Sequence, residues 1–427
     1  MPRKLSRRQA FGLAGAALGT PMLAASARAQ PTARVVVVGG GFGGVAAART
    51  LRRLAPDIAV TLVVESPVFT TCPFSNTVIG GMRDLQSIQF SYDALQSTGI
   101  DIHVDKALGV ETGGKRIRLA SGESLTYDRA ILSPGIDFRY DALPDIGPEV
   151  AEQLPHAWKA GAQTLLLRDQ IRAMRQGGTI IIAPPDNPFR CPPGPYERAS
   201  LIAHYLSRHN PTAKILIVDG KDKFSKQSLF QAAWDELYPG MITFIPFSEH
   251  AGLKSIDVGQ RRIDTFFGSF DADVINLIPP QSAAKIVLDA GLAGTGYWCE
   301  IDGLTFESKV AEGVHVIGDA AIVGDMPKSG FSASTQGKAC AHAVLALLRD
   351  NPPERALLMN TCYSLVGPDY GISVAGVYQS DTETNRLSSL PGTGGTSEAG
   401  NLPQLRQDEA AFARGWYANL TQELFGA

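Results

Sequence analysis

The chain has 427 residues, of which 44% are hydrophobic and 19% charged, and its formal net charge is −3 at pH 7. These values are typical of a globular protein with several domains, and they exclude the basic excess of proteins that bind nucleic acid. After the N-terminal segment, no apolar run has the length that a membrane-spanning helix needs, so we expect no membrane span.

Residues 1–29 have the pattern of an export signal. Basic residues precede a weakly apolar run over 10–25, and the Ala-Arg-Ala stretch at 27–29 fits a cleavage site that needs small residues. The Ser-Arg-Arg triplet at 6–8 resembles a twin-arginine signal, a route that exports proteins already folded around a cofactor. A disordered basic N-terminus is the alternative. Cleavage would remove five positive charges and no acidic residue, which moves the formal charge from −3 to −8, and we predict a periplasmic protein.

A dinucleotide-binding fingerprint follows this segment. Four valines at 35–38 predict a buried parallel strand, and a glycine-rich turn leads from it into a predicted helix over 45–54. In such a turn Gly39 permits the tight bend, Gly41 lets backbone N–H groups approach a pyrophosphate, and Gly44 lets the helix pack on the strand. This order predicts a site for FAD or NAD, and a glycine-rich turn of an unrelated α/β fold is the alternative.

The second predicted strand, 60–64, ends at Glu65. An acidic side chain at this position suits a ribose 2′-hydroxyl and disfavours the phosphate of NADP. We therefore predict that the cofactor contacts the following residues: Gly39, Gly41, Phe42, Gly43, Gly44 and Glu65.

Two later segments resemble motifs of flavoproteins that have two dinucleotide-binding domains. The strand predicted over 127–132 is followed by a Ser-Pro-Gly triplet that ends at Gly135, and this resembles the Ala-Thr-Gly motif where those chains return to the FAD domain. The strand predicted over 313–317 ends at Gly318 and Asp319, and in that superfamily such an aspartate bonds the ribityl chain of FAD. With the fingerprint, these segments predict FAD as the first cofactor.

The middle region, 156–280, is predicted to be a second Rossmann-like unit inserted into the first. Strands are expected at 178–183 and 214–219, with a helix over 197–208 between them. The turn at 184–195 is rich in proline instead of glycine. Proline has no N–H donor and a fixed φ, so this turn cannot form a cradle of backbone amides around a pyrophosphate. We therefore predict that the nicotinamide site is lost.

These elements predict an α/β fold with two Rossmann-like dinucleotide-binding domains, the second of them degenerate, and a C-terminal α+β interface domain. The predicted boundaries are 1–29 for a twin-arginine-type signal peptide, 30–155 for the first part of the FAD domain, 156–280 for the inserted domain, 281–350 for the second part of the FAD domain and 351–427 for the interface domain. The Gly/Ser/Thr-rich stretch at 388–400 is expected to be a surface loop.

Five cysteines, at positions 72, 191, 299, 340 and 362, permit disulfides in an oxidising compartment but do not indicate a disulfide-rich scaffold. The chain has no Cys-x-x-Cys-His motif, so we expect no c-type haem on it, and no clustered His and Cys residues indicate a metal site. Cys299 and Cys340 are interpreted as small core residues.

Four short segments together resemble the flavoprotein subunit of flavocytochrome c sulfide dehydrogenase. They are TCPFSN at 71–76, PFRCPPGPYER at 188–198, VINLIPP at 274–280 and NTCYS at 360–364, and the resemblance extends from about residue 33 to the C-terminus. It implies FAD bound covalently through a thioether from Cys72, and a redox-active disulfide between Cys191 and Cys362 beside the flavin. It also implies a catalytic base at Glu197 and a separate c-type cytochrome subunit as partner.

The chemistry of sulfide fits these assignments. HS⁻ is a small anion and a two-electron donor that needs a soft electrophile and an electron sink, and a disulfide beside a flavin offers both. The alternative for Cys191 and Cys362 is an ordinary stabilising disulfide or two buried thiols. For Glu197 the alternative is an acid favoured by a helix N-terminus. Lys328, before the helix predicted over 333–349, is placed to face the flavin ring, and an exposed loop lysine is its alternative.

The leading interpretation is a periplasmic sulfide dehydrogenase flavoprotein that oxidises sulfide to elemental sulfur or polysulfide and passes electrons to a c-type cytochrome. A sulfide:quinone oxidoreductase is the second. It would need a membrane-facing end, but core packing explains the apolar stripe over 409–425 more simply. Trp416 in this segment is interpreted as a core residue, and packing over the flavin is the alternative. A non-catalytic flavoprotein that activates a sulfur-oxidising complex is the third, and the proline-rich turn disfavours an NADH-dependent disulfide reductase.

Overall fold

The computed structural model describes residues 31–294 and 296–426 of the chain, and the export signal predicted for 1–29 lies outside them. The N-terminal valines form β1, an inner strand of a six-stranded sheet with the order β20, β21, β9, β1, β2, β5. Its strands are β1 (Arg34–Val38), β2 (Ala59–Val64), β5 (Asp101–Val104), β9 (Arg129–Leu132), β20 (Glu307–Ser308) and β21 (Ala311–Val316). Neighbouring strands are parallel except for β20 and β21, and the sheet takes strands from both sides of the middle region.

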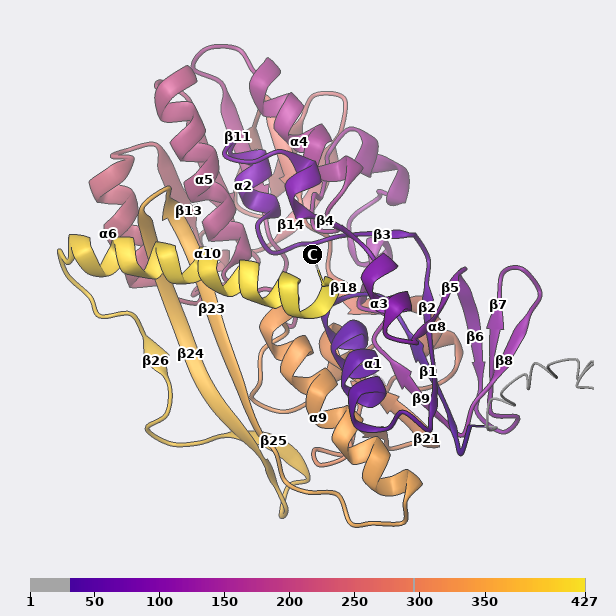
Figure 1. Cartoon of the computed structure of the whole chain (residues 1–427). Helices are drawn as coiled ribbons and strands as arrows, with labels where there is room; N and C mark the ends of the chain where they lie inside the picture. Colours follow the sequence, from indigo (N-terminus) through magenta and orange to yellow (C-terminus); the bar gives the residue numbers. More distant parts are fainter. Residues whose placement is uncertain (1–30, 295, 427) are drawn as a thin grey trace, which may run out of the picture. The chain divides into compact units, whose positions relative to one another are not determined.

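Two long helices pack together against this sheet. α1 (Phe42–Leu54) follows β1, and α9 (Gly330–Leu348) lies beside it (Figure 1). They approach closely because a glycine faces a glycine: a Cβ at Gly337 would lie 2.3 Å from the carbonyl oxygen of Gly43. The valines of β1 at 35–38 are 0–5% exposed, as expected of a parallel strand covered on both faces. Both predicted helices begin three residues earlier in the structure, because each starts directly after its glycine or serine N-cap.

A second, smaller sheet of four parallel strands has the order β13, β12, β11, β17. Its strands are β11 (Thr179–Ala183), β12 (Lys214–Val218), β13 (Ile242–Ile245) and β17 (Val274–Leu277), and its longer helices are α4 (Ala162–Ala173), α5 (Gly194–His209) and α6 (Gln227–Leu237). The β11–α5–β12 unit has the Rossmann-like course predicted from the sequence, and the proline-rich turn joins its first strand to its helix.

The C-terminal part is an antiparallel sheet with a long helix along it. β23 (Leu357–Gly367) pairs with β24 (Tyr370–Asp381), which also pairs with β25 (Arg386–Ser389) and β26 (Gly395–Thr396). α10 (Pro403–Phe425) lies along β24, and β23 contacts both α5 and α9 (Figure 1). Strand β23 therefore lies where the two parallel-sheet units and the C-terminal part meet.

The remaining elements are short and connect these units. The strands are β3 (Val68–Thr70) with β4 (Gln89–Ser91), β6 (Ala107–Glu111) with β7 (Arg116–Leu119) and β8 (Ser124–Thr126), β10 (Ile136–Phe138) with β18 (Gln281–Ala283), β14 (Leu253–Asp257) with β15 (Arg262–Thr265) and β16 (Ser269–Asp271), and β19 (Cys299–Glu300) with β22 (Ala321–Ile322). The helices are α2 (Ser75–Ile79), α3 (Asp93–Ser97), α7 (Phe247–His250) and α8 (Lys285–Asp289), with 3₁₀ turns η1 (Leu85–Ile88), η2 (Tyr140–Ala142), η3 (Pro148–Glu152) and η4 (Gly318–Ala320).

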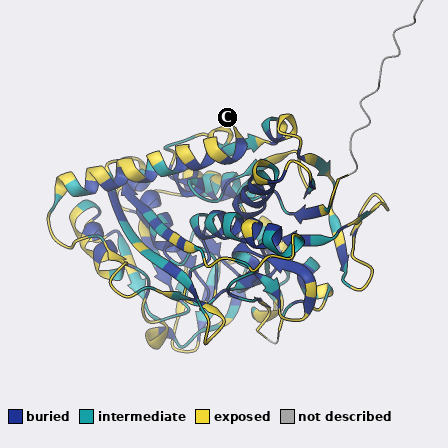
Figure 2. Cartoon of the chain, turned by 60° about the horizontal axis from the view of Figure 1, so that its bottom comes forward, coloured by how far each residue is buried: buried dark blue, intermediate teal, exposed yellow. Residues whose placement is uncertain are grey.

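Buried residues follow the strands and the inner sides of the helices, and exposed residues lie on outer turns and along α10 (Figure 2). In α10, Leu420 and Leu424 are buried but Phe412 is 59% exposed, so core packing explains only part of the apolar stripe predicted there. Among the helices of 31–294 and 296–426, none combines the length and the apolar character that crossing a membrane requires.

Candidate active site

The turn between β1 and α1 has the geometry of a dinucleotide cradle. Gly39 has a φ of +105°, a conformation that favours glycine, and a Cβ at Gly44 would lie 1.9 Å from the Gly39 carbonyl oxygen. At Gly41 a Cβ would approach nothing closer than Phe69, at 3.7 Å. Phe42 begins α1 and packs edge to face on Phe69, with ring centroids 5.6 Å apart. The open side of the turn thus lies at the N-terminus of a 13-residue helix, the arrangement that binds pyrophosphate groups.

Other predicted cofactor contacts lie at the carboxyl ends of strands in the same sheet. Glu65 follows β2, and its side chain is 70% exposed and bound to a lysine, Lys106, at 2.9 Å. Gly135 follows β9 and Gly318 follows β21, and both have a positive φ, 76° and 70°. Open α/β sheets bind their ligands beyond this end of the strands.

Asp319 has a buried carboxylate oxygen without a partner. Its Oδ1 atom makes no hydrogen bond within the described residues, and its Oδ2 atom lies 3.6 Å from Arg190 Nη1. An unpaired buried oxygen costs about 1–3 kcal/mol, so such a group points to a polar ligand. The N–H of Gly318 donates to Gln336 Oε1 at 2.8 Å, which fixes the turn that carries Asp319. The glycine turn and this carboxylate together fit a dinucleotide cofactor.

Lys328 is bound to the turn that carries Asp319. Its ammonium group donates hydrogen bonds to the backbone carbonyls of Asp319, at 2.8 Å, and of Ala321, and lies 3.9 Å from the centroid of the Trp298 ring. The residue is 9% exposed, so it is not an exposed loop lysine either. Because two carbonyls of η4 and its flank accept from it, Lys328 supports the turn that carries Asp319, and its contact with the flavin stays a prediction.

The proline-rich turn brings Cys191 to a cavity. Cys191 has a φ of 56° and lies three residues before α5 begins. Its N–H donates to the Lys328 carbonyl oxygen at 2.8 Å, which ties this turn to the segment before α9. Burial raises the pKa of the Cys191 thiol, and the neighbouring Cys362 and Glu197 raise it further. A neutral thiol or a bonded sulfur is therefore the favoured form of Cys191.

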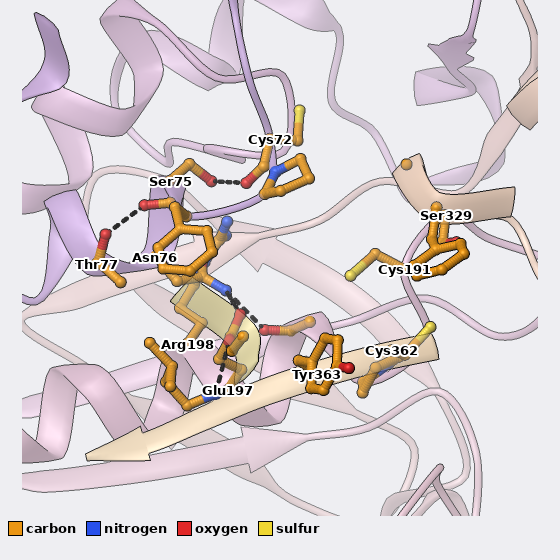
Figure 3. Close-up of a pocket in the computed structure, with 18 of the residues that line it drawn as sticks. Cys72, Ser75, Asn76, Thr77, Cys191, Glu197, Arg198, Ser329, Cys362 and Tyr363 are labelled. Carbon is orange, nitrogen blue, oxygen red and sulfur yellow. Dashed lines mark hydrogen bonds between the residues drawn. The ribbon is translucent and has the colours of Figure 1, made fainter. Parts of the chain in front are cut away.

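Cys362 reaches the same cavity from β23. Residues two apart in a strand face the same way, so Asn360, Cys362 and Ser364 share the buried face of β23. Asn360 Nδ2 lies 3.3 Å from Cys362 Sγ. Figure 3 shows Cys191 and Cys362 near each other on one side of the cavity, with Cys72 on another. In the described residues all five cysteines are free thiols, and the Cys191–Cys362 bond stays a prediction.

The cavity has a volume of about 110 Å³ and lies between the second parallel-sheet unit, α9 and the C-terminal part. It is lined by the segment 72–77, by residues of 190–198, by the start of α9, by β23 and by α10; Cys72, Cys191, Glu197, Cys362 and Trp416 are among its lining residues. Three of the four segments that carry the family resemblance therefore meet at one cavity.

Glu197, in the first turn of α5, is held by two donors. Asn76 Nδ2 donates to its Oε2 at 2.8 Å, and the Leu365 N–H donates to its Oε1 at 2.9 Å (Figure 3). Burial nevertheless raises the pKa of this carboxyl above its ordinary value. A fixed carboxyl with a raised pKa, on the wall of the cavity that three cysteines line, is suited to accepting and returning a proton there.

Arg198 links the segments around the cavity, a role that sequence reasoning did not assign. The side chain is 2% exposed and donates to Asn76 Oδ1 at 3.0 Å and to Asn276 Oδ1 at 2.8 Å. It also donates to the carbonyl oxygens of His156 and Ala157. Burial lowers its pKa to about 10, which leaves it charged. One cation therefore connects α5, the α2 segment, the segment before α4 and β17.

Sequence reasoning missed Lys226 entirely. This lysine directly precedes α6, is 6% exposed, and donates from Nζ to the Cys362 carbonyl oxygen and to Ser364 Oγ, both at 2.8 Å. No motif surrounds it, and only the folded position of β23 over α6 brings it to the site.

Trp416 and Cys72 complete the lining. Trp416, predicted as a core residue, lines the cavity and stacks on Phe331 with ring centroids 5.7 Å apart. Cys72 Sγ lies 3.5 Å from the Trp158 carbonyl oxygen. The other two cysteines, Cys299 and Cys340, are 0% exposed and are not among the residues that line the cavity. Within 31–294 and 296–426, no cluster of three or more His, Cys, Asp or Glu side chains could hold a metal ion.

Three family models match the chain. Residues 164–279 match the central part of the sulfide dehydrogenase (flavocytochrome c) flavoprotein chain, and residues 354–425 match the flavin-binding model of flavocytochrome c sulphide dehydrogenase. Residues 33–169 match the pyridine nucleotide-disulphide oxidoreductase model. In chain order the three matches cover 33–169, 164–279 and 354–425, and residues 280–353, which contain β20, β21 and α9, lie between the second and the third.

Individual proteins give the same picture. A sulfide dehydrogenase (flavocytochrome c) flavoprotein chain of Chlorobaculum thiosulfatiphilum is 64% identical over 47 residues, which are 11% of this chain and 98% of that sequence. A sulfide-quinone reductase of Aquifex aeolicus is 21% identical over 386 residues, 80% of this chain and 83% of that sequence. The crystal structure of the sulfide:quinone oxidoreductase from Aquifex aeolicus superposes with a TM-score of 0.73 at 18% identity, covering 91% of each chain. The fold is that of flavoproteins with two dinucleotide-binding domains.

Proposed function

The chain belongs to the family of flavocytochrome c sulfide dehydrogenase flavoproteins, and from that premise we propose that it is the sulfide-oxidising subunit of a periplasmic complex whose electron acceptor is a separate c-type cytochrome. It is a flavoprotein oxidoreductase that acts on sulfide. The observation that carries the finer proposal is the meeting of Cys191, Cys362 and Glu197 at one cavity, beside Cys72.

FAD is the cofactor, and we propose that it is bound covalently to a cysteine. Bound FAD supplies a two-electron acceptor that can return its electrons one at a time. The turn of Gly39, Gly41 and Gly44 and the unpaired Oδ1 atom of Asp319 would hold its dinucleotide part. The link is proposed at Cys72, which lines the same cavity as the two other cysteines.

The proposed chemical step uses a Cys191–Cys362 disulfide. HS⁻ attacks one of the two sulfurs, a new S–S bond forms between sulfide and that cysteine, and the Cys191–Cys362 bond breaks with its electron pair left on the other cysteine as a thiolate. Atoms and charge balance, because one negative charge enters on HS⁻ and one remains on the released sulfur. The cysteine persulfide that results carries the substrate sulfur.

Glu197 would manage the proton of this step. The persulfide retains the proton that HS⁻ brought, and that proton must leave before the sulfur can be released or extended. A carboxylate fixed by Asn76 and by the Leu365 amide on the wall of the cavity can take it. The raised pKa of Glu197 then lets the carboxyl return the proton without a large energetic cost.

The sequence and the family support both a cytochrome partner and a periplasmic location. The chain has no Cys-x-x-Cys-His motif of its own, and its relative in Chlorobaculum thiosulfatiphilum is named as the flavoprotein chain of a flavocytochrome. The export pattern of residues 1–29 supports a periplasmic location. A quinone acceptor is the competing function, supported by the likeness to sulfide-quinone reductases.

Anaerobic mixing of the purified flavoprotein with sulfide tests the activity, and the acceptor assay separates the two functions. We expect sulfide to bleach the flavin and the reduced protein to reduce a soluble c-type cytochrome much faster than a short-chain ubiquinone. Faster reduction of the quinone would assign the quinone function. A flavin that sulfide leaves oxidised, in a protein that still restores activity to a sulfur-oxidising complex, would assign the non-catalytic role.

A further inference from the structure

Lys226 lies beneath β23 with its ammonium group enclosed. Its Nζ atom donates to the Cys362 carbonyl oxygen at 2.8 Å, to Ser364 Oγ at 2.8 Å and to the Ile372 carbonyl oxygen at 3.5 Å. The backbone of Lys226 is left-handed, with φ 63°, which turns the side chain from the start of α6 toward β23 and β24. Each proton of the ammonium group thus has an acceptor, and each acceptor is neutral.

This cation has no ion-pair partner among the described residues, since no carboxylate oxygen there lies within 4.0 Å of its nitrogen. The ionisable groups whose charge favours the protonated form of Lys226 and raises its pKa are Cys362, Glu197, Cys191 and Glu409. Burial lowers the pKa of Lys226 to about 8, and Cys362 is the group that opposes this shift most. A buried ammonium without a counter-ion is costly, so its presence calls for an anion that forms during the reaction.

The sulfur of Cys362 is the anion in the best position. The Ser364 hydroxyl contacts Lys226, and the side chain of Cys362, two residues earlier in β23, projects from the same face of the strand. On that face Asn360 Nδ2 also lies 3.3 Å from Cys362 Sγ. An amide donor and a buried cation therefore both favour negative charge on this sulfur.

We propose that Lys226 is a positioning residue that supplies the counter-charge for an anionic sulfur on Cys362. The proposal rests on the proposed function, in which opening the Cys191–Cys362 bond leaves one negative charge on the cysteine pair. The ammonium group of Lys226 holds the backbone of Cys362 by donating to the Cys362 carbonyl oxygen, and its charge stabilises the negative charge on the Cys362 sulfur through space. It does not touch sulfide, and it neither gives nor takes a proton in the step.

The test measures the ionisation of Cys362 in the holoprotein after reduction of the cysteines with a phosphine, with no sulfide and no acceptor present. Brief alkylation with iodoacetamide across a pH series, followed by peptide mass spectrometry, gives a midpoint for Cys362. We expect Lys226→Met, which keeps the length of the side chain, to move that midpoint upward by about one pH unit, a roughly tenfold loss of thiolate at a given pH. The midpoint of Cys191 should move much less.

Matched variants separate charge from structure. Ser364→Ala removes a hydrogen-bond acceptor but leaves the cation, and Lys214→Met removes an exposed lysine that also donates to a carbonyl, Gly240 O at 2.7 Å. Both should keep the wild-type midpoint for Cys362. If Lys226→Met does not fold, Lys226→Gln removes the charge and retains a donor, and it should give the same upward shift, whereas Lys226→Arg should keep a midpoint close to that of the wild type.

An unchanged Cys362 midpoint in Lys226→Met or Lys226→Gln would overturn the proposal and reduce Lys226 to a support of β23. This readout needs no turnover. A wild-type protein that fails to oxidise sulfide would refute the proposed function while the shift in the Cys362 midpoint still decided the role of Lys226.

Discussion

The Tyr196 hydroxyl donates a hydrogen bond to the carboxylate of Asp219, at the carboxyl end of β12. In a Rossmann unit an acidic side chain there binds the ribose of the cofactor, but Asp219 is 0% exposed and is also bound by Lys221. The next residue, Gly220, packs on the proline-rich turn so closely that a Cβ there would lie 2.7 Å from the Asp186 nitrogen. Side chains and backbone of this chain thus occupy the end of β12 and the turn that follows β11.

We therefore predict that NADH and NADPH do not reduce the flavin. In an anaerobic stopped-flow experiment, the absorbance of the oxidised flavin should stay constant after mixing with NADH and fall after mixing with sulfide. Sulfide serves as the positive control in the same protein preparation. Rapid bleaching by NADH would show that the Asp219 end of β12 opens to a nicotinamide, and the degenerate-domain assignment would then be wrong.

Covalent attachment of FAD at Cys72 is the second prediction. The intact mass of the denatured protein should exceed that of the processed polypeptide by one FAD, and acid precipitation should give a yellow pellet. Cys72→Ser should still bind FAD through the glycine turn but release it into the supernatant on denaturation. Cys299→Ser, at a buried cysteine away from the cavity, is the control and should keep the link. An unmodified mass in native protein that contains flavin would contradict the prediction.

The third prediction concerns the cysteine pair. Cys191→Ser and Cys362→Ser should each keep FAD yet slow its reduction by sulfide by roughly two orders of magnitude or more, because the covalent step is lost. Thiol counting under denaturing conditions should find two thiols fewer in the oxidised wild type than in the reduced wild type. In Cys340→Ala, a substitution inside α9, sulfide should reduce the flavin at the wild-type rate. If sulfide reduces the flavin in both serine variants as fast as in the wild type, a direct reaction of sulfide with the flavin is favoured.

The fold was predictable because it depends on local patterns. The valines of β1, the glycines that follow them and the proline-rich turn each have one strong conformational or hydrogen-bonding preference, and the structure has the corresponding strand, turn and α5 at those positions. The candidate site depends on contacts between segments far apart in the sequence. Lys226 reaches β23 across 136 residues, and no pattern around it indicates that contact.

The direction of individual side chains is the other feature that the sequence does not predict. The sequence places Lys328 before α9, but it does not indicate that the ammonium group donates to the backbone carbonyls of Asp319 and Ala321. Trp416 packs against the core, as predicted, and it also lines the cavity. Periodicity indicates which face of a helix is covered, but the covering surface can be a cavity wall as well as a core.

The last prediction follows from the raised pKa of Glu197. If its carboxylate is the base, flavin reduction at a fixed concentration of HS⁻ should accelerate as the pH rises through the raised pKa of Glu197, because the carboxyl is protonated below that pKa and cannot accept a proton. Glu197→Gln should lower the rate and remove this acid limb, whereas Glu249→Gln, on an exposed turn of α7, should keep it. The same limb in Glu197→Gln would exclude the base role.

Stability gives an independent check with a defined sign. Because the folded protein holds the proton of Glu197 more tightly than the unfolded chain does, the stability that the neutral carboxyl contributes is present at low pH and is lost as the pH rises through the raised pKa. The difference in unfolding free energy between the wild type and Glu197→Gln should therefore shift in favour of the variant as the pH rises. A difference that is independent of pH would mean that burial does not raise this pKa, and Glu197 would then be ionised throughout the range in which the enzyme works.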